Sequence, residues 1–156
     1  MAENPFFIGK RTSLSLEYAI SKCKTYEDFT RMFSDDMLDD DGQLCNILEK
    51  LRYKNMPEKS LTAVSQLAGQ ADSYFGNILN GKKKNPSRDV LICFAFTLKA
   101  TFDETQALLK AAGHAPLYVR RKRDVIIWFG LTKRQSLGDV NESLKNYGFK
   151  PLCKDI

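Results

Sequence analysis

Apolar residues recur at intervals of three and four along most of the chain, a spacing that places side chains on one face of an α-helix. Leu44, Ile47, Leu48 and Leu51 follow this spacing and predict a helix over about 43–53. No Asn-Gly or Asp-Gly pair lies between segments of alternating apolar and polar residues, so a β-hairpin is not indicated. The pattern therefore predicts an all-α protein.

The N-terminal part carries two shorter helical patterns. One helix is predicted over about 13–23, and another begins at Thr25, where "TYED" places an acidic residue three positions later, as in a capping box. Next comes "SDDMLDDDG", residues 34–42, whose five aspartates and glycine interrupt regular structure. We therefore predict an acidic helical segment over 1–41, with a domain boundary behind it.

Two short helices around a glycine are predicted in the middle of the chain. Ser60 is a favourable N-cap for a helix over about 61–68. Gly69 supplies the turn, and a second helix follows over about 71–79. Gly81 stands where a helix C-terminus favours a left-handed residue. This order is that of a helix-turn-helix.

The C-terminal half contains an internal repeat. Residues 88–117 align with residues 123–152 without a gap, and eleven of the thirty positions are identical. Each copy has the pattern of a helix, a turn, a capped second helix, a glycine and Pro-Leu, which describes a helical hairpin. Two copies are too few for a free-standing solenoid. We therefore predict a domain over 42–117 that includes the first copy. The second copy, in 118–156, is predicted to pack on the first.

An Arg-Asp pair opens both copies, as Arg88-Asp89 and as Arg123-Asp124. Recurrence at the start of a helix favours a structural role, as a cap or an ion pair, over contact with DNA. The basic tract at 120–123 nevertheless offers a second surface to which phosphates could bind.

Charge is unevenly distributed along the chain, whose formal net charge is +5. Residues 1–41 hold five Lys or Arg against nine Asp or Glu, a net charge of −4. Residues 42–90 have a net charge of +4 and the remainder +5, which suits a polyanionic partner. The acidic stretch at 35–41 is interpreted either as a modulator of affinity for DNA or as a solvated linker.

The sequence argues against several other classes of protein. The four cysteines are far apart and His114 is the single histidine, so the spacing of a metal site is absent. A glycine-rich phosphate loop is also absent, and we expect neither an enzyme nor a cofactor. The lack of a long apolar run or a secretory signal predicts a cytoplasmic protein that does not enter membranes.

Residues 43–98 resemble the lambda-repressor-like (Xre-type) helix-turn-helix family of DNA-binding proteins. The resemblance is carried by a capped helix, a glycine turn, a helix with apolar residues three apart, and a Gly-Lys pair followed by proline. These elements are Ser60, Val64, Ser65, Gly69, Phe75, Ile78, Gly81, Lys82 and Pro86. The resemblance implies a lambda-repressor-like bundle, to which the hairpin repeat and the N-terminal helices are added. It also implies a bacterial or phage transcription regulator that binds double-stranded DNA, as a homodimer.

Alignment with the family implies which residues contact DNA. Asp72, Ser73 and Asn77 take the positions that reach base edges from the recognition helix, about 71–79. Contacts to the phosphate backbone are implied for a second set of residues, Ser60, Lys82, Lys84 and Asn85.

Two other interpretations stay open. The chain could be an adaptor that uses the helix-turn-helix as a scaffold and binds a protein partner through the N-terminal helices or the second hairpin. Lys82, Lys83 and Lys84 would then only solvate a turn. RNA binding is a weaker option, because the sequence offers no aromatic platform on which bases could stack.

Overall fold

The computed structural model describes residues 13–33 and 43–154, and these residues form helices and turns without a strand. The prediction of an all-α protein is confirmed. The chain divides into two compact units, Met1–Asp39 and Asp40–Ile156. The acidic stretch, which is interpreted either as a modulator of affinity for DNA or as a solvated linker, falls in residues 34–42 and lies outside the described residues. Within the described ranges, no helix has both the length and the apolar character that crossing a membrane requires.

The first unit contains α1 (Ser13–Lys22) and α2 (Tyr26–Met32). α2 begins where the sequence predicts, because the Thr25 hydroxyl accepts a hydrogen bond from the Asp28 N–H at 3.1 Å. The rings of Phe29 and Phe33 meet with their centroids 5.0 Å apart on the apolar side of α2.

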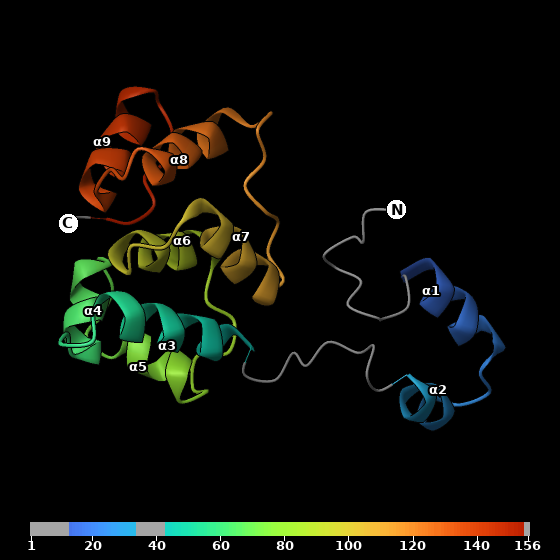
Figure 1. Cartoon of the computed structure of the whole chain (residues 1–156). Helices are drawn as coiled ribbons and strands as arrows, with labels where there is room; N and C mark the ends of the chain where they lie inside the picture. The colour runs from blue at the N-terminus through green and yellow to red at the C-terminus, as the bar shows by residue number, and fades with distance from the viewer. Residues whose placement is uncertain (1–12, 34–42, 155–156) are drawn as a thin grey trace. The chain divides into compact units, whose positions relative to one another are not determined.

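The second unit contains seven helices among its described residues. They are α3 (Gln43–Asn55), α4 (Leu61–Leu67), α5 (Tyr74–Leu79), α6 (Arg88–Thr97), α7 (Phe102–Ala111), α8 (Lys122–Thr132) and α9 (Leu137–Asn146). Figure 1 shows them in layers, with α6 and α7 between α3–α5 on one side and α8–α9 on the other. Every predicted helix is present, but α3 extends two residues further and α5 starts three residues later than the sequence indicates.

One hydrophobic core runs through all three layers. It includes Leu48 from α3, Phe75 from α5, Phe94 from α6, and Ile127 and Leu144 from the second hairpin, all fully buried. Because the second hairpin shares this core, its burial contributes to the stability of the same unit as the helix-turn-helix.

The sequence repeat is also a structural repeat. Lys99 and Arg134 occupy the same place in the two hairpins, and both have φ of 56°. Gly113 and Gly148 end α7 and α9 with φ of 75° and 79°, a left-handed conformation that glycine adopts at little cost.

A side-chain clamp recurs at the end of each copy. Gln106 Oε1 accepts a hydrogen bond from the Leu117 N–H at 2.8 Å, and Asn141 Oδ1 accepts one from the Leu152 N–H at 2.7 Å. The two hairpins therefore close by the same contact, 35 residues apart in the sequence.

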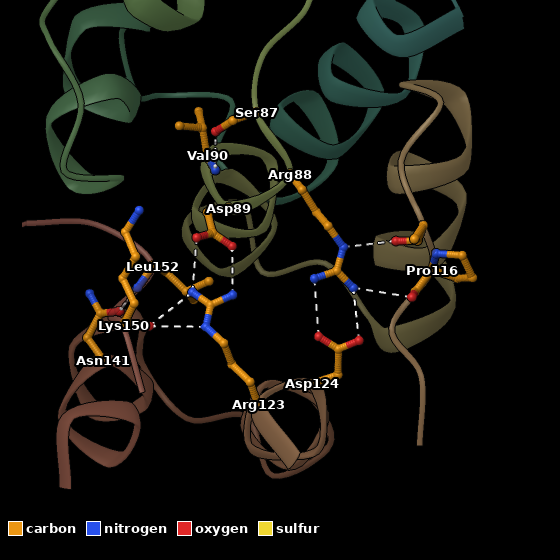
Figure 2. Close-up of polar contacts among 11 residues, drawn as sticks. Ser87, Arg88, Asp89, Val90, Pro116, Arg123, Asp124, Asn141, Lys150 and Leu152 are labelled. Carbon is orange, nitrogen blue, oxygen red and sulfur yellow. Dashed lines mark hydrogen bonds and ion pairs between the residues drawn. The ribbon is translucent and has the colours of Figure 1, made fainter. Parts of the chain in front are cut away.

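The recurring Arg-Asp pairs join the two hairpins crosswise, as Figure 2 shows. The Arg88 guanidinium donates to both carboxylate oxygens of Asp124, at 3.1 and 3.0 Å. Arg123 donates in the same way to Asp89, at 2.9 Å to each oxygen. Each arginine also donates to backbone carbonyls of its own hairpin's C-terminal segment, at Ala115 and Pro116 for Arg88 and at Lys150 for Arg123.

These contacts confirm the predicted ion-pair role and exclude Arg123 from a free phosphate-binding tract. Bidentate pairs of this kind fix geometry as well as charge, so they hold the two hairpins in one relative orientation. Arg120, Arg121 and Lys122 remain exposed beside them.

Candidate nucleic-acid interface

α4 begins at Ser60, as the sequence predicts. The Ser60 backbone is extended, and its hydroxyl accepts a hydrogen bond from the Ala63 N–H at 3.0 Å. A serine hydroxyl that accepts one hydrogen bond still carries a proton to donate. Since Ser60 is exposed, it can cap the helix and donate to a phosphate oxygen at the same time.

Ser65 connects α4 to α5. Its fully buried hydroxyl donates to the Leu61 carbonyl at 3.0 Å and accepts from the Phe75 N–H at 2.9 Å. The second hydrogen bond satisfies a backbone N–H in the first turn of α5, where no helical partner exists. A single small side chain thereby fixes the start of α5 against α4.

The turn between α4 and α5 is longer than predicted. Gly69 has φ of 69°, and the Gln70 N–H donates back to the Ser65 carbonyl at 2.9 Å, so the chain leaves α4 at this point. The Tyr74 N–H then closes a turn onto the Ala71 carbonyl at 2.9 Å. The predicted range of 71–79 for the second helix is therefore wrong at its start, because residues 71–73 belong to the turn and α5 has six residues.

Of the three residues predicted to read bases, Asp72 and Ser73 lie in the turn and Asn77 lies in α5. Asp72 and Ser73 are exposed, and Asn77 is partly exposed. The Asn77 side-chain amide lies 3.4 Å from the Ser73 hydroxyl, so these two side chains lie side by side. Phe75 and Ile78 point into the core, and the helix geometry therefore leaves the side of α5 that bears Ser73 and Asn77 free.

Asp72 contacts α4, whereas Ser73 and Asn77 contact each other. Its carboxylate accepts a hydrogen bond from the Gln66 side-chain amide at 3.1 Å. Sequence reasoning missed Gln66, because the contact joins a residue of α4 to a residue of the turn that follows and leaves no periodic signal in the chain. Gln66 is exposed and belongs to the candidate surface.

The lysine turn, residues 80–85, has a fixed backbone. Asn80 Oδ1 accepts a hydrogen bond from the Lys82 N–H at 2.9 Å, and the Lys83 N–H donates to the Asn77 carbonyl at 2.8 Å. Between them, Gly81 adopts φ of 80°. The turn is thus attached to the same residue, Asn77, that lies on the free side of α5.

The three lysines of this turn are not equivalent. The Lys83 ammonium lies 5.5 Å from the centre of the Tyr74 ring, a cation–π contact. Partial burial raises the pKa of the Tyr74 phenol above its ordinary value. Lys82, Lys84 and Asn85 are exposed residues of the turn.

A last contact connects the turn to the first hairpin. The His114 side chain, through Nε2, forms a hydrogen bond with the Pro86 carbonyl at 2.8 Å. The Ser87 hydroxyl then caps α6 by accepting from the Val90 N–H at 3.3 Å. The lysine turn is therefore held at both ends, which lowers the conformational entropy lost when a ligand binds.

The assembled surface consists of three amides, two hydroxyls, one carboxylate and exposed ammonium groups, which belong to Gln66, Asn77, Asn85, Ser60, Ser73, Asp72, Lys82 and Lys84. Such groups can donate to phosphate oxygens and to acceptors on base edges, and Asp72 can accept from a base amino group. Comparison of the chain with family models, with curated proteins and with solved structures finds no match.

Proposed function

We propose that this chain is a transcription regulator that binds double-stranded DNA through α5 and the lysine turn. In this assignment Asp72, Ser73 and Asn77 contact base edges. The phosphate backbone is contacted by Ser60, Lys82, Lys84 and Asn85. The resemblance of residues 43–98 to the lambda-repressor-like family supports the same assignment.

The observation that carries this proposal is the attachment of the lysine turn to the free side of α5. The hydrogen bond from the Lys83 N–H to the Asn77 carbonyl joins the cationic turn directly to a candidate base-reading residue. A site that reads sequence needs phosphate contacts to set its register and polar side chains next to them. Both kinds of group are present here on one fixed backbone.

A homodimer is part of the proposal. One recognition helix contacts only a few base pairs, so specific binding by this class of motif usually combines two half-sites about one helical turn apart. A palindromic preference in selected DNA would accompany such a dimer.

The test is a DNA-binding titration at two salt concentrations, with random competitor and with DNA from around the protein's own gene. Phosphate contacts make the affinity fall as salt rises, whereas sequence readout makes one duplex resist the competitor. Binding that depends on salt and also resists the competitor is the expected result. No binding at either salt concentration would overturn the proposal.

A second candidate function is an adaptor that binds a protein partner on the helix-turn-helix scaffold. It is favoured by the shortness of α5, six residues, and by the negative charge of Asp72 beside the presumed DNA. The side chain of Leu61, at the start of α4, also lies against Gly76 of α5 and presents apolar surface there. The same titration separates the two functions, because an adaptor of this kind has no duplex preference.

A further inference from the structure

One face of α8 is apolar at its centre and exposed. Phe129 has 58% of its surface accessible, and Val125 and Ile126, one turn before it, are only partly buried. These positions, together with Lys122 and Lys133, follow the spacing of a single helix face. We call these five residues the α8 face.

In the other copy of the internal repeat, the equivalent helix face is packed against a neighbouring helix. The residues of α6 that correspond to Ile126 and Phe129 are Leu91 and Phe94, and both are fully buried. The Phe94 ring is covered by α5, with centroids 5.1 Å from Phe75 and 6.0 Å from Tyr74. In the first hairpin, therefore, this face receives another helix.

The ends of the α8 face differ from those of α6 in a consistent way. Lys122 replaces Ser87, and Lys133 replaces Leu98, which is fully buried in the first copy. Both lysines are exposed. They stand eleven positions apart, a separation of about 16 Å along a helix axis. The second copy thus keeps the apolar centre and adds a positive charge at each end.

The apolar surface continues beyond the helix. Val119, Tyr147 and Phe149 line a shallow hollow of about 270 Å³ together with Val125 and Ile126. Arg120 and Lys122 line the same hollow. Tyr147 is exposed to 74%, and exposed apolar groups that gather in this way mark interaction surfaces.

We propose that the α8 face is a docking surface for an acidic amphipathic helix of a partner protein. The partner helix would place an apolar stripe over Phe129 and the hollow, with carboxylates about three turns apart opposite Lys122 and Lys133. Charge decides against a second copy of this chain as the occupant. Two α8 faces in contact would bring lysines against lysines, a repulsion that disfavours the pair. The proposal is independent of whether α5 binds DNA.

The experiment measures fluorescence anisotropy with labelled peptide probes and the full chain. The first probe is an Ala-rich peptide of about 18 residues, long enough to form a helix in water, with a Leu stripe and Glu at both ends of that stripe. A second probe has the same stripe with Lys in place of Glu. The variants are Phe129→Ser, the double variant Lys122→Glu/Lys133→Glu, and the control Tyr53→Ser, which removes a more exposed aromatic side chain from α3 (79% exposed).

The wild type and Tyr53→Ser are expected to bind the Glu probe, and Phe129→Ser to bind it at least about tenfold more weakly. The double variant is expected to reverse the order of affinity and bind the Lys probe more tightly than the Glu probe. That reversal tests the surface even if Phe129→Ser unfolds. Equal binding by wild type and all variants, or no binding of the Glu probe, would overturn the proposal. Sedimentation that shows self-association abolished only in Phe129→Ser would overturn it too, in favour of a second copy.

Discussion

Ser65 and Asp72 determine, at the scale of single residues, how the candidate interface is built. The buried Ser65 hydroxyl holds the first turn of α5, and the exposed Asp72 carboxylate is held by Gln66. The first contact sets the position of the helix and the second sets the orientation of one side chain. Their removal should therefore affect different properties, stability in one case and sequence preference in the other.

Ser65→Ala should lower the free energy of unfolding by about 1–3 kcal/mol, because it leaves the buried Phe75 N–H without an acceptor. Urea denaturation followed by circular dichroism measures this change, with the slope m expected to stay constant. Ser73→Ala is the matched control, since Ser73 is exposed and its side chain makes no cap hydrogen bond. It should change stability by less than about 0.5 kcal/mol. Equal effects of the two variants would contradict the assigned role of Ser65.

Asp72→Asn should move the preference at one base position from cytosine toward adenine, because an amide can both donate to and accept from adenine. The discrimination expected is about 1–3 kcal/mol at that position. Selection from randomised duplexes with the wild type and the variant measures it, and Asp103→Asn on α7 controls for the loss of one negative charge. If Asp72 is only a repelling charge, Asp72→Asn and Asp72→Ala will both tighten binding to every duplex alike.

At the scale of elements, contacts between distant segments fix the relative positions of the lysine turn, α5 and the two hairpins. The lysine turn is held to α5 by the bond between Lys83 and Asn77, and to the first hairpin by the bond between Pro86 and His114. The two hairpins are held to each other by crossed ion pairs. Substitutions in the turn should therefore change binding, and substitutions in the ion pairs should change stability.

Replacement of both Lys82 and Lys84 by Ala should weaken binding to all duplexes, whatever their sequence. The slope of log K against log salt should fall by about one for each DNA phosphate that a lysine no longer neutralises. The paired control is Lys50→Ala with Lys145→Ala, two exposed lysines on α3 and α9. A slope that stays the same in the Lys82/Lys84 variant would mean that these lysines only solvate the turn.

Arg88→Ala should destabilise the second unit by about 3–5 kcal/mol, because it leaves the Asp124 carboxylate buried without its cation. The Asp124 side chain is only 4% exposed. Its remaining hydrogen bond, from the Tyr118 N–H at 3.0 Å, favours the lower end of that range. Chemical denaturation measures the loss. Arg31→Ala, which breaks a surface pair whose arginine is 79% exposed, should have little effect.

At the scale of the whole molecule, the second hairpin completes the core of its unit. Trp128 of α8 stacks on Phe102 of α7 with ring centroids 4.0 Å apart, and Ile127 and Leu144 belong to the continuous core. Removal of α8 and α9 would expose this surface and break both crossed ion pairs. The helix-turn-helix and the hairpins should therefore unfold together.

A chain that stops after Leu117 should melt at a lower temperature than the full chain or aggregate through the newly exposed apolar face. Thermal unfolding by circular dichroism and light scattering measure these outcomes. A chain that starts at Asp40 is the control, because it keeps the second compact unit whole, and its main transition should be unchanged. An unchanged melting temperature and full solubility of the shorter chain would show that the second hairpin is an independent module.

The sequence by itself determined the features that depend on residues a few positions apart. Ser60 caps α4, Gly81 takes a left-handed conformation, and the two hairpins repeat at a constant offset, all as the pattern indicates. Such features follow from local hydrogen bonds and steric preferences, which the neighbouring residues set. The candidate DNA contacts stay predictions that rest on the same local pattern.

Only the tertiary structure decided the contacts between distant segments. The start of α5 depends on Ser65, ten positions earlier, and the partner of Arg88 is Asp124 of the other hairpin rather than the adjacent Asp89. Phe94 and Phe129 are the same residue at the same place in the repeat, yet one is fully buried and the other 58% exposed. Burial depends on which distant segments of the fold pack against a side chain. α5 covers Phe94, whereas no helix among the described residues covers Phe129 to the same extent.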